Sequence, residues 1–245
     1  MRIGIKGVGF DAFTPEEALE RAADLAFDPG CRYVVTPNPE IVWLAGKQPQ
    51  LKQALNGADL VVPDGIGIVY AARILGTPLP ARVPGIELAA GLLRRMADTG
   101  EPVYLLGAKP GVAERAADRL REQYPGLRIV GTGDGYFRED EPVIGQINAC
   151  RPRLLFVCLG FPRQELWMAE NRDRIEAGLM LGLGGSLDVF AGDVKRAPEF
   201  WQRMNLEWFY RLIQQPSRIG RMLKLPVFLL SVVWERLKHG KTNRV

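Results

Sequence analysis

Short apolar segments rich in valine, isoleucine and leucine alternate along most of this chain with longer segments of helical periodicity. We expect strands at residues 3–5, 33–35, 60–62, 103–106, 127–130, 154–159 and 179–183. We expect helices from Thr14 onward and at residues 40–45, 67–75, 86–97, 110–124, 141–149 and 163–174. Near-continuous apolar strands between amphipathic helices are typical of parallel sheets covered on both faces. The sequence therefore predicts an α/β fold with a mainly parallel, Rossmann-like sheet.

The pattern changes near Pro198, after which no further strand-like segment follows. Helix-like segments at 200–214, 217–225 and 227–238 are separated by prolines, which interrupt helices. A chain of 245 residues, 47% of them hydrophobic, is long enough for one large domain with an appendage. We therefore expect an α/β core at residues 1–196 and a helical appendage at residues 197–245.

The expected appendage is basic and aromatic. Residues 196–245 contain ten Lys or Arg and three Glu, which gives this segment a net charge of +7. The whole chain has a net charge of +4, so the remainder carries −3. The most apolar stretch of the appendage, residues 223–233, falls well short of the ~20 apolar residues that a membrane-spanning helix needs. These features predict that the appendage lies on an anionic membrane surface.

The composition argues against several classes of chemistry. The one histidine, His239, stands near the end of the sequence, which disfavours Ser-His-Asp, Cys-His and histidine-based metal sites. The cysteines Cys31, Cys150 and Cys158 have no metal-ligand spacing, and the sequence opens into an apolar strand rather than a signal peptide. We therefore expect a reduced, cytoplasmic protein. We expect no nucleic-acid partner, because the positive charge is confined to an apolar segment without a nucleic-acid-binding motif.

Two expected strands end in short polar loops. Thr36 and Asn38 follow the strand at 33–35, and Asp64 follows the strand at 60–62. Ligands of open α/β sheets bind at the carboxyl ends of the strands. Asp64 stands between a proline that stiffens the backbone and a glycine that lets a substrate approach. A carboxylate held in this way is suited to act as a general base toward a hydroxyl group.

Other turns after strands are candidates for binding a substrate. Gly107 begins a glycine turn before a helix, which suits a phosphate or nucleotide, although an ordinary strand-to-helix turn explains it equally well. Asp134 and Tyr136 lie in a turn with three glycines that could form a floor for a base or a sugar. The amide of Gln164, in the first turn of a helix, can bind sugar hydroxyls or simply face water. Arg82 lies in a Pro/Gly-rich loop, where a fixed contact is more plausible than for most arginines.

Two glycine-containing segments leave their roles open. Ser186 and Asp188, after a run of glycines, either cap a short helix or serve the site. Gly7 and Gly9 fit the G-x-G-x-x-A pattern of dinucleotide-binding loops, but the helix signal starts later, at Thr14. We therefore expect a turn at Gly7 rather than a nicotinamide-cofactor site.

The appendage also carries candidate ligands for an anion. Arg211, Arg218 and Arg221 share one face if the helix resumes after Pro216. Guanidinium groups suit the oxygens of a diphosphate, and attraction to anionic lipid explains the same residues. The chain has no Asp-x-Asp pair of the kind that holds a metal in many nucleotide-sugar transferases. Arginines or helix N-termini are then needed to stabilise a departing diphosphate.

Six motifs occur in order along the chain. They are Thr36-Pro37-Asn38-Pro39-Glu40, Pro63-Asp64-Gly65-Ile66-Gly67, Arg82-Val83-Pro84-Gly85, Gly133-Asp134-Gly135-Tyr136-Phe137, Leu159-Gly160-Phe161-Pro162-Arg163-Gln164-Glu165 and Gly184-Gly185-Ser186-Leu187-Asp188. Together they resemble the WecG/TagA/CpsF family of bacterial glycosyltransferases, over about residues 3 to 225. The chain is most similar to the N-acetylmannosaminyltransferase branch of that family.

The resemblance implies an inverting transfer of a sugar from a UDP-sugar to undecaprenyl-diphosphate N-acetylglucosamine at the inner face of the cell membrane. It implies teichoic acid linkage-unit synthesis, whereas other branches transfer a uronic acid or act in exopolysaccharide assembly. It also implies that no metal or other cofactor is needed and that the protein forms dimers or larger assemblies.

The same resemblance assigns roles to residues of this chain. It implies that Asp64 is the base and that Thr36, Asn38, Arg82 and Gln164 line the substrate pocket. It places Arg211, Arg218 and Arg221 in a membrane-binding appendage that closes over the site. On the residues alone a non-catalytic module that binds a nucleotide-sugar or a lipid remains an alternative.

Overall fold

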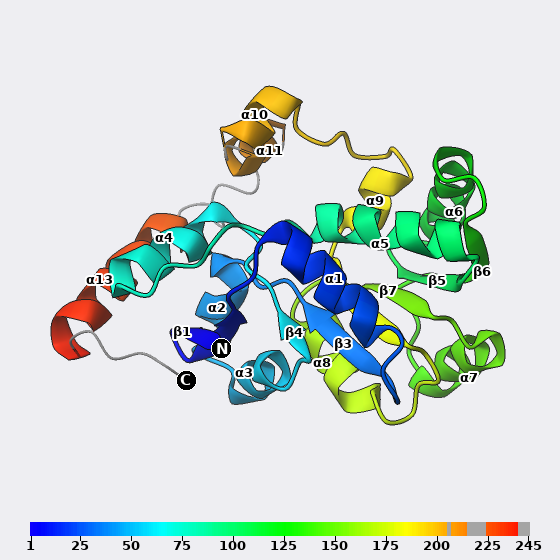
Figure 1. Cartoon of the computed structure of the whole chain (residues 1–245), viewed down its shortest axis with the longest axis horizontal. Coiled ribbons are helices and arrows are strands. Elements are labelled where there is room, and N and C mark those ends of the chain that lie inside the picture. Colours follow the sequence, from blue (N-terminus) through cyan, green and yellow to red (C-terminus); the bar gives the residue numbers. More distant parts are fainter. Residues whose placement is uncertain (205–206, 215–223, 240–245) are drawn as a thin grey trace.

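Six parallel strands form the main sheet of the computed structural model, which describes residues 1–204, 207–214 and 224–239 (Figure 1). The strands are β3 (Arg32–Val35), β4 (Leu60–Val61), β5 (Pro102–Gly107), β6 (Arg128–Gly133), β7 (Leu154–Cys158) and β8 (Leu179–Gly182). Their order across the sheet is β4-β3-β8-β7-β5-β6, and each neighbouring pair is parallel. The predicted α/β class and mainly parallel sheet are confirmed.

Helices cover both faces of this sheet. One face is covered by α1 (Pro15–Leu25), α5 (Gly85–Thr99), α6 (Val112–Gln123) and α9 (Ser186–Phe190). The other is covered by α2 (Pro39–Ala45), α3 (Pro49–Asn56), α4 (Ile66–Leu75), α7 (Asp140–Cys150) and α8 (Arg163–Asn171). From β5 the chain passes through α6 to β6, at the edge of the sheet. It then returns toward the middle of the sheet through α7 to β7 and through α8 to β8. Because such crossovers are right-handed, the outward and returning helices lie on opposite faces.

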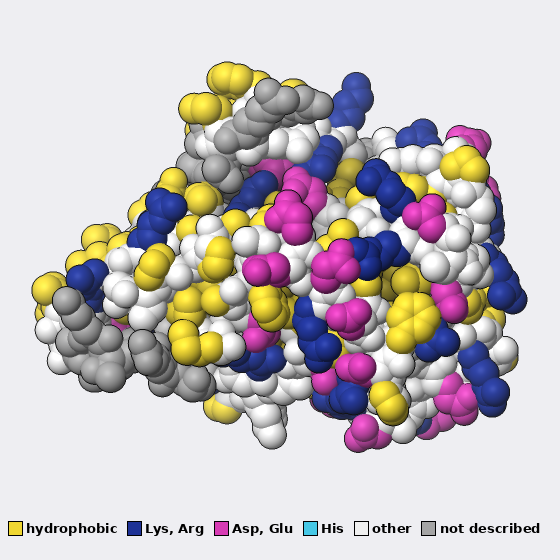
Figure 2. All heavy atoms as spheres, in the orientation of Figure 1, with side chains coloured by type: hydrophobic (Ala, Val, Ile, Leu, Met, Phe, Trp, Pro, Cys, Tyr) yellow, Lys and Arg dark blue, Asp and Glu magenta, His cyan; other side chains and the backbone are white. Residues whose placement is uncertain are grey.

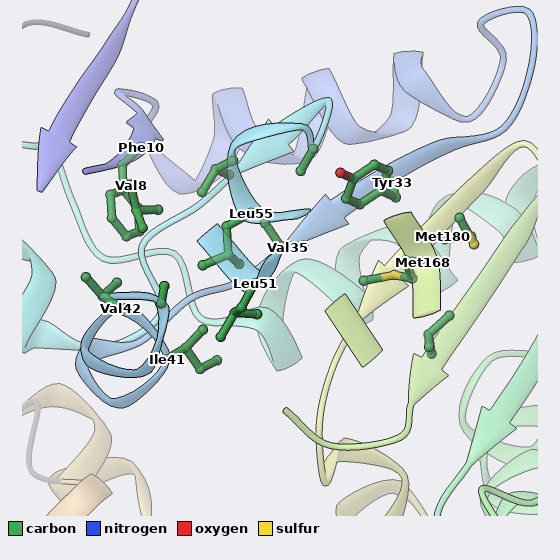
Figure 3. Packing of buried hydrophobic residues seen from close by; sticks show 14 of the residues in the cluster. Val8, Phe10, Tyr33, Val35, Ile41, Val42, Leu51, Leu55, Met168 and Met180 are labelled. Atoms are coloured by element: carbon green, nitrogen blue, oxygen red, sulfur yellow. The ribbon is translucent and has the colours of Figure 1, made fainter. Parts of the chain in front are cut away.

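The core of the second face draws together elements from the first half of the chain. Figure 3 shows Phe10 in the same core as Val42 of α2, Leu51 of α3 and Val35 of β3. Phe10, Val42 and Leu51 are completely buried, and Val35 is 1% exposed. This packing fixes the carboxyl end of β3, from which the first candidate loop emerges.

The first strand is not part of the main sheet. The strand β1 (Arg2–Ile5) pairs in an antiparallel hairpin with β2 (Val8–Asp11). Lys6 and Gly7 form the two-residue turn, with φ angles of 54° and 79° that match the turns favoured in tight hairpins. The turn expected at Gly7 is confirmed, whereas β2 and α3 were not predicted from the sequence.

The C-terminal segment contains α10 (Glu199–Arg203), α11 (Glu207–Gln214) and α13 (Lys224–His239). The expected interruption at Pro226 is wrong, because Pro226 lies in the first turn of α13, where its missing N–H has no helical partner to lose. Figure 1 shows α13 lying along α4. Phe228 and Val232 of α13 are completely buried and belong to the same core as α2 and α4. The division at residue 196 stays a prediction.

Among the described helices, none is long and apolar enough to cross a membrane. The helix α13 is the longest of them at 16 residues. The helix contains charged residues together with apolar ones such as Phe228. Apolar side chains therefore do not cover its whole circumference.

The burial of α13 can be tested by mutation. Phe228→Ala should lower the free energy of unfolding by about 3–5 kcal/mol, because it removes a fully buried ring and leaves a cavity. Leu230→Ala, on the same helix but 69% exposed, should change it by less than about 0.5 kcal/mol. Urea denaturation measures both variants. Equally small effects would contradict the packing of α13 in the core.

Candidate active site

The loops after β3 and β4 are joined by backbone hydrogen bonds. The Val62 N–H donates to Val35 O at 3.1 Å, and the Asp64 N–H donates to Pro37 O at 3.2 Å. Gly65 follows with a φ of +111°, which only glycine adopts readily. Asp64 is therefore held beside the loop that follows β3 by its own backbone, and its side chain is half-buried.

Asn38 shapes the same loop through its side chain. Its Oδ1 accepts hydrogen bonds from the N–H groups of Glu40 at 2.9 Å and Ile41 at 3.1 Å, so that Asn38 is the N-cap of α2. A carbonyl oxygen used in this way leaves the amide nitrogen as the polar group that can meet a ligand. The helix N-terminus at this point also adds positive potential next to Asp64.

The loop that carries Arg82 lies against both of these loops. The Val83 N–H donates to Pro63 O at 2.9 Å. Gly85, at the start of α5, is so close to Thr36 that a Cβ atom there would lie 3.1 Å from Thr36 Oγ1. Thr36, Asp64 and Arg82 are thus brought to one place by contacts between loops that are distant in sequence.

The turn after β8 completes this group. Thr36 Oγ1 donates to Gly182 O at 3.2 Å, and Thr36 is 8% exposed. The Gly184 N–H donates to Oε1 of Gln164, at the start of α8, at 2.9 Å. Gln164 is 3% exposed, so it holds the glycine turn from within rather than facing open water. The five residues predicted as base and pocket therefore adjoin the ends of four neighbouring strands.

Gly107, Asp134 and Tyr136 lie at the ends of β5 and β6, on the far side of β7. Gly107 packs so tightly on β7 that a Cβ atom there would meet the Cys158 carbonyl, which is a structural reason for glycine. Asp134 Oδ1 accepts from the Tyr136 N–H at 2.7 Å and so shapes its own turn. The Tyr136 side chain is 66% exposed.

The first turn of α8 connects the two halves of the edge. Arg163 donates from Nη2 to Phe137 O at 3.1 Å and from Nη1 to Gly135 O, and its guanidinium lies 4.4 Å from the centre of the Phe137 ring. The next residue, Gln164, holds the turn after β8. The helices after β5 and β7 leave on opposite faces of the sheet, which is the arrangement that opens a ligand crevice between two strands.

Arg82 is held by a carboxylate 125 residues away in the chain. Its Nη1 donates to Glu207 Oε2 of α11 at 2.8 Å, and the two side chains are only 14% and 15% exposed. The other oxygen of Glu207 is 3.4 Å from Nε of Arg196, which also pairs with Glu87 of α5. This ion-pair cluster attaches α11 to the loop next to Asp64. A guanidinium has five N–H donors, so the bond to Glu207 uses part of the capacity of Arg82.

Comparison with known sequences identifies the class of protein. The sequence profile of the glycosyl transferase WecG/TagA/CpsF family matches residues 3–242. The chain belongs to the WecG/TagA/CpsF family of glycosyltransferases. The predicted family membership is confirmed.

Two relatives illustrate how close this glycosyltransferase is to named members. It is 36% identical over 244 residues to a protein of Staphylococcus aureus (strain MW2) named N-acetylglucosaminyldiphosphoundecaprenol N-acetyl-beta-D-mannosaminyltransferase, covering 99% of this chain and 96% of the relative. It is 38% identical over 211 residues to a protein of the same name from Bacillus spizizenii, covering 86% of this chain and 80% of the relative.

Some predicted site residues of this glycosyltransferase are outside the part that the structure describes. Arg218 and Arg221 lie outside the described residues, and Arg211 belongs to α11 by its backbone alone. Within the described part of the chain, no group of three or more His, Cys, Asp or Glu side chains is arranged to hold a metal ion.

Of the two roles left open for Ser186, capping of the helix is not the one observed. Gly185 is the N-cap of α9, without a side-chain hydrogen bond, and Ser186 Oγ instead donates to Leu183 O at 2.8 Å. The chain turns back on itself here, so the hydroxyl reaches a preceding carbonyl rather than the helix N–H groups ahead.

Sequence reasoning missed Glu165. Its side chain is 1% exposed, and its Oε1 accepts from Gln164 Nε2 at 2.9 Å. Burial raises the pKa of Glu165 from 4.5 to about 7, and the hydrogen bond from Gln164 opposes the shift without cancelling it. Nothing in the local sequence separates this glutamate from a surface residue of a helix; only the burial of the first turn of α8 does so.

The raised pKa predicts a pH dependence of stability. The folded-state pKa lies above the unfolded value, so the stabilising contribution of Glu165 is full below pH 4.5 and is lost as the pH rises to about 7. Relative to Glu165→Gln, the wild type should lose about 3 kcal/mol of unfolding free energy over that interval. Denaturant melts across this pH range measure the difference. Glu170→Gln, exposed on the same helix, is the control and should follow the wild type; a parallel Glu165→Gln curve would contradict the prediction.

Proposed function

We propose that this glycosyltransferase moves N-acetylmannosamine from UDP-N-acetylmannosamine to undecaprenyl-diphosphate N-acetylglucosamine, in assembly of the teichoic acid linkage unit. The near-complete alignment with a relative named for this activity supports the proposal. The observation that carries it is the placement of Asp64 beside Thr36, Asn38 and Arg82 at the carboxyl edge of a parallel sheet. Donor and acceptor can both be reached from that edge.

In this proposal Asp64 acts as the general base. It takes the proton of the acceptor hydroxyl as that oxygen attacks the anomeric carbon of the donor, and the bond from that carbon to the UDP oxygen breaks with inversion. Thr36, Asn38 and Gln164 border the sugar. The departing diphosphate carries negative charge that guanidinium groups can neutralise, and Arg82, Arg211, Arg218 and Arg221 are the candidates.

The nucleotide half of the donor is proposed to lie over β5 and β6. The turn at Gly107 precedes the N-terminus of α6. The N-cap of this helix is Gly111, so no side chain caps its first N–H groups. The positive end of that helix favours a phosphate. Asp134 borders the same region, and the exposed ring of Tyr136 offers an apolar surface for a base. Neighbouring strands lie ~4.8 Å apart, so the ends of β4 and β5 are separated by about 19 Å. An elongated UDP-sugar suits such a span.

The role of Asp64 has a direct test. Asp64→Asn should keep donor binding and lower turnover roughly 10²–10⁴-fold, because it removes the base but leaves the backbone bond to Pro37. Transfer to a short-chain lipid-diphosphate N-acetylglucosamine, followed by mass spectrometry with a panel of UDP-sugars, measures turnover and donor choice. Calorimetry with UDP measures binding.

The control for this test is Asp28→Asn, a carboxylate paired with Arg21 between α1 and β3, at the edge of the sheet away from Asp64, which should transfer at the wild-type rate. Equal loss of binding and turnover in Asp64→Asn would contradict the role as base. If only a different UDP-sugar is transferred, that sugar replaces N-acetylmannosamine in the proposal. If UDP binds but no sugar is transferred, the protein is a non-catalytic binding module.

We also propose that the C-terminal helices rest on the inner face of the cell membrane. Val227, Leu230, Trp234 and Leu237 are 49–76% exposed and spaced three, four and three residues apart, so they share one face of α13. Figure 2 shows hydrophobic side chains gathered over α4 and α13 and on α10 and α11. Together with the net charge of +7 after residue 195, this supports a peripheral site on anionic lipid.

The membrane proposal predicts a specific loss of binding. Trp234→Asp should weaken binding to vesicles containing phosphatidylglycerol about tenfold or more, since it replaces an exposed ring by a charge that anionic lipid repels. Phe27→Asp is the matched control, because this aromatic side chain is 53% exposed at the opposite edge of the sheet. Co-sedimentation at two salt concentrations measures both. Equal losses in the two variants would contradict a membrane-binding face on α13.

A further inference from the structure

The first turn of α8 holds both halves of the candidate site. Arg163 bonds the carbonyls of Gly135 and Phe137, whereas Gln164 accepts from the Gly184 N–H. The two side chains leave adjacent residues in different directions. A change in the orientation of Gln164 therefore moves one half of the edge without moving the other.

Gln164 can hold Gly184 in only one orientation of its amide group. Its Oε1 must face the Gly184 N–H, because the reversed amide would place a donor against a donor. The oxygen and the nitrogen of an amide are nearly equal in size, so packing alone does not favour this orientation over the reversed one. An acceptor on the other side of the amide, facing Nε2, favours the orientation in which Oε1 faces Gly184.

Glu165 supplies that acceptor. Its Oε1 accepts from Gln164 Nε2 at 2.9 Å, and the pair is almost completely buried, at 1% and 3% exposed. Glu165 Oε2 makes no hydrogen bond to the described part of the chain. A buried carboxyl group with one unpaired oxygen is costly, so its retention calls for a compensating role.

We infer that Glu165 is a positioning residue for the donor pocket: by accepting from Gln164 Nε2 it fixes the amide that holds the turn after β8 beside Thr36. The hydrogen bonds run from Glu165 through Gln164 to Gly184, and Thr36 Oγ1 binds Gly182 O two residues earlier. Glu165 thus acts on the pocket without touching the substrate. The inference rests on the proposed transfer from a UDP-sugar at this edge.

Two substitutions separate positioning from a purely structural role. Glu165→Gln keeps an acceptor for Gln164, whereas Glu165→Leu removes it at similar volume. Asn148→Leu is the control, since it removes the hydrogen bonds that Asn148 makes to Arg174 O at 2.9 Å and to the Glu176 N–H at 2.8 Å, near the C-terminal end of α7. All three variants are compared by thermal melting and by donor kinetics.

The expected result is a change in donor KM with little change in kcat. Glu165→Leu should raise the KM for UDP-N-acetylmannosamine and its Kd by calorimetry about three- to tenfold, the loss expected for one hydrogen bond. Glu165→Gln should stay within about twofold of the wild type. Asn148→Leu should lower the melting temperature without changing the donor KM. In a Gln164→Leu background, Glu165→Leu should add no further change in KM.

Other outcomes would overturn the inference. An unchanged donor KM in Glu165→Leu would do so, as would an equal rise in Asn148→Leu or an additive rise in the Gln164→Leu background. Should Glu165→Leu fail to fold, Glu165→Asp carries the test, because its shortened carboxylate cannot reach Gln164 and should raise KM likewise. Absence of transfer by the wild type from any UDP-sugar would instead overturn the proposed function.

Discussion

The parallel pairing of the six strands is the constraint on which the candidate site depends. Because every strand of the main sheet runs in the same direction, every loop at its carboxyl ends opens on one edge. The polar residues that follow β3, β4, β7 and β8 are far apart in sequence, yet they meet without any long insertion. The order of the strands then determines which loops touch: β3 lies between β4 and β8, so its loop contacts the loops of both.

Within that edge, backbone hydrogen bonds join the loops after β3 and β4 to each other and to the loop of Arg82. Asp64 is positioned by its N–H on Pro37 O, and the Arg82 loop by the Val83 N–H on Pro63 O. Both of these bonds are made by backbone atoms, so they remain when a side chain is replaced. The turn after β8 differs, because it depends on the Thr36 and Gln164 side chains. This part of the edge is the more sensitive to mutation.

Local signals in the sequence predicted much of this fold. Apolar runs predicted the strands of the main sheet, and the helix signal at Thr14 predicted the start of α1, where Thr14 and Glu17 form a capping box. Features that depend on distant contacts were missed: β2 exists because it pairs with β1, and the burial of Glu165 follows from the packing of α8. The strand order and the bond from Arg82 to Glu207 likewise have no local sequence signal. For the candidate site, the sequence therefore predicted which residues gather, but not which of them hold one another.

The C-terminal helices are attached by two different kinds of interaction. The helix α13 buries Phe228 and Val232 completely, in addition to an ion pair between Glu235 and Lys6 and a hydrogen bond from Arg236 to Ile74 O. The helix α11 is joined to the core through Glu207, whose carboxylate lies between Arg82 and Arg196. Attraction between charged groups that keep some exposure weakens as ionic strength rises. The segment with excess positive charge is thus docked through one of its few acids. The position of α11 next to Arg82 therefore depends on charge at this edge, whereas α13 keeps its buried Phe228 and Val232 when its ion pair to Lys6 is screened.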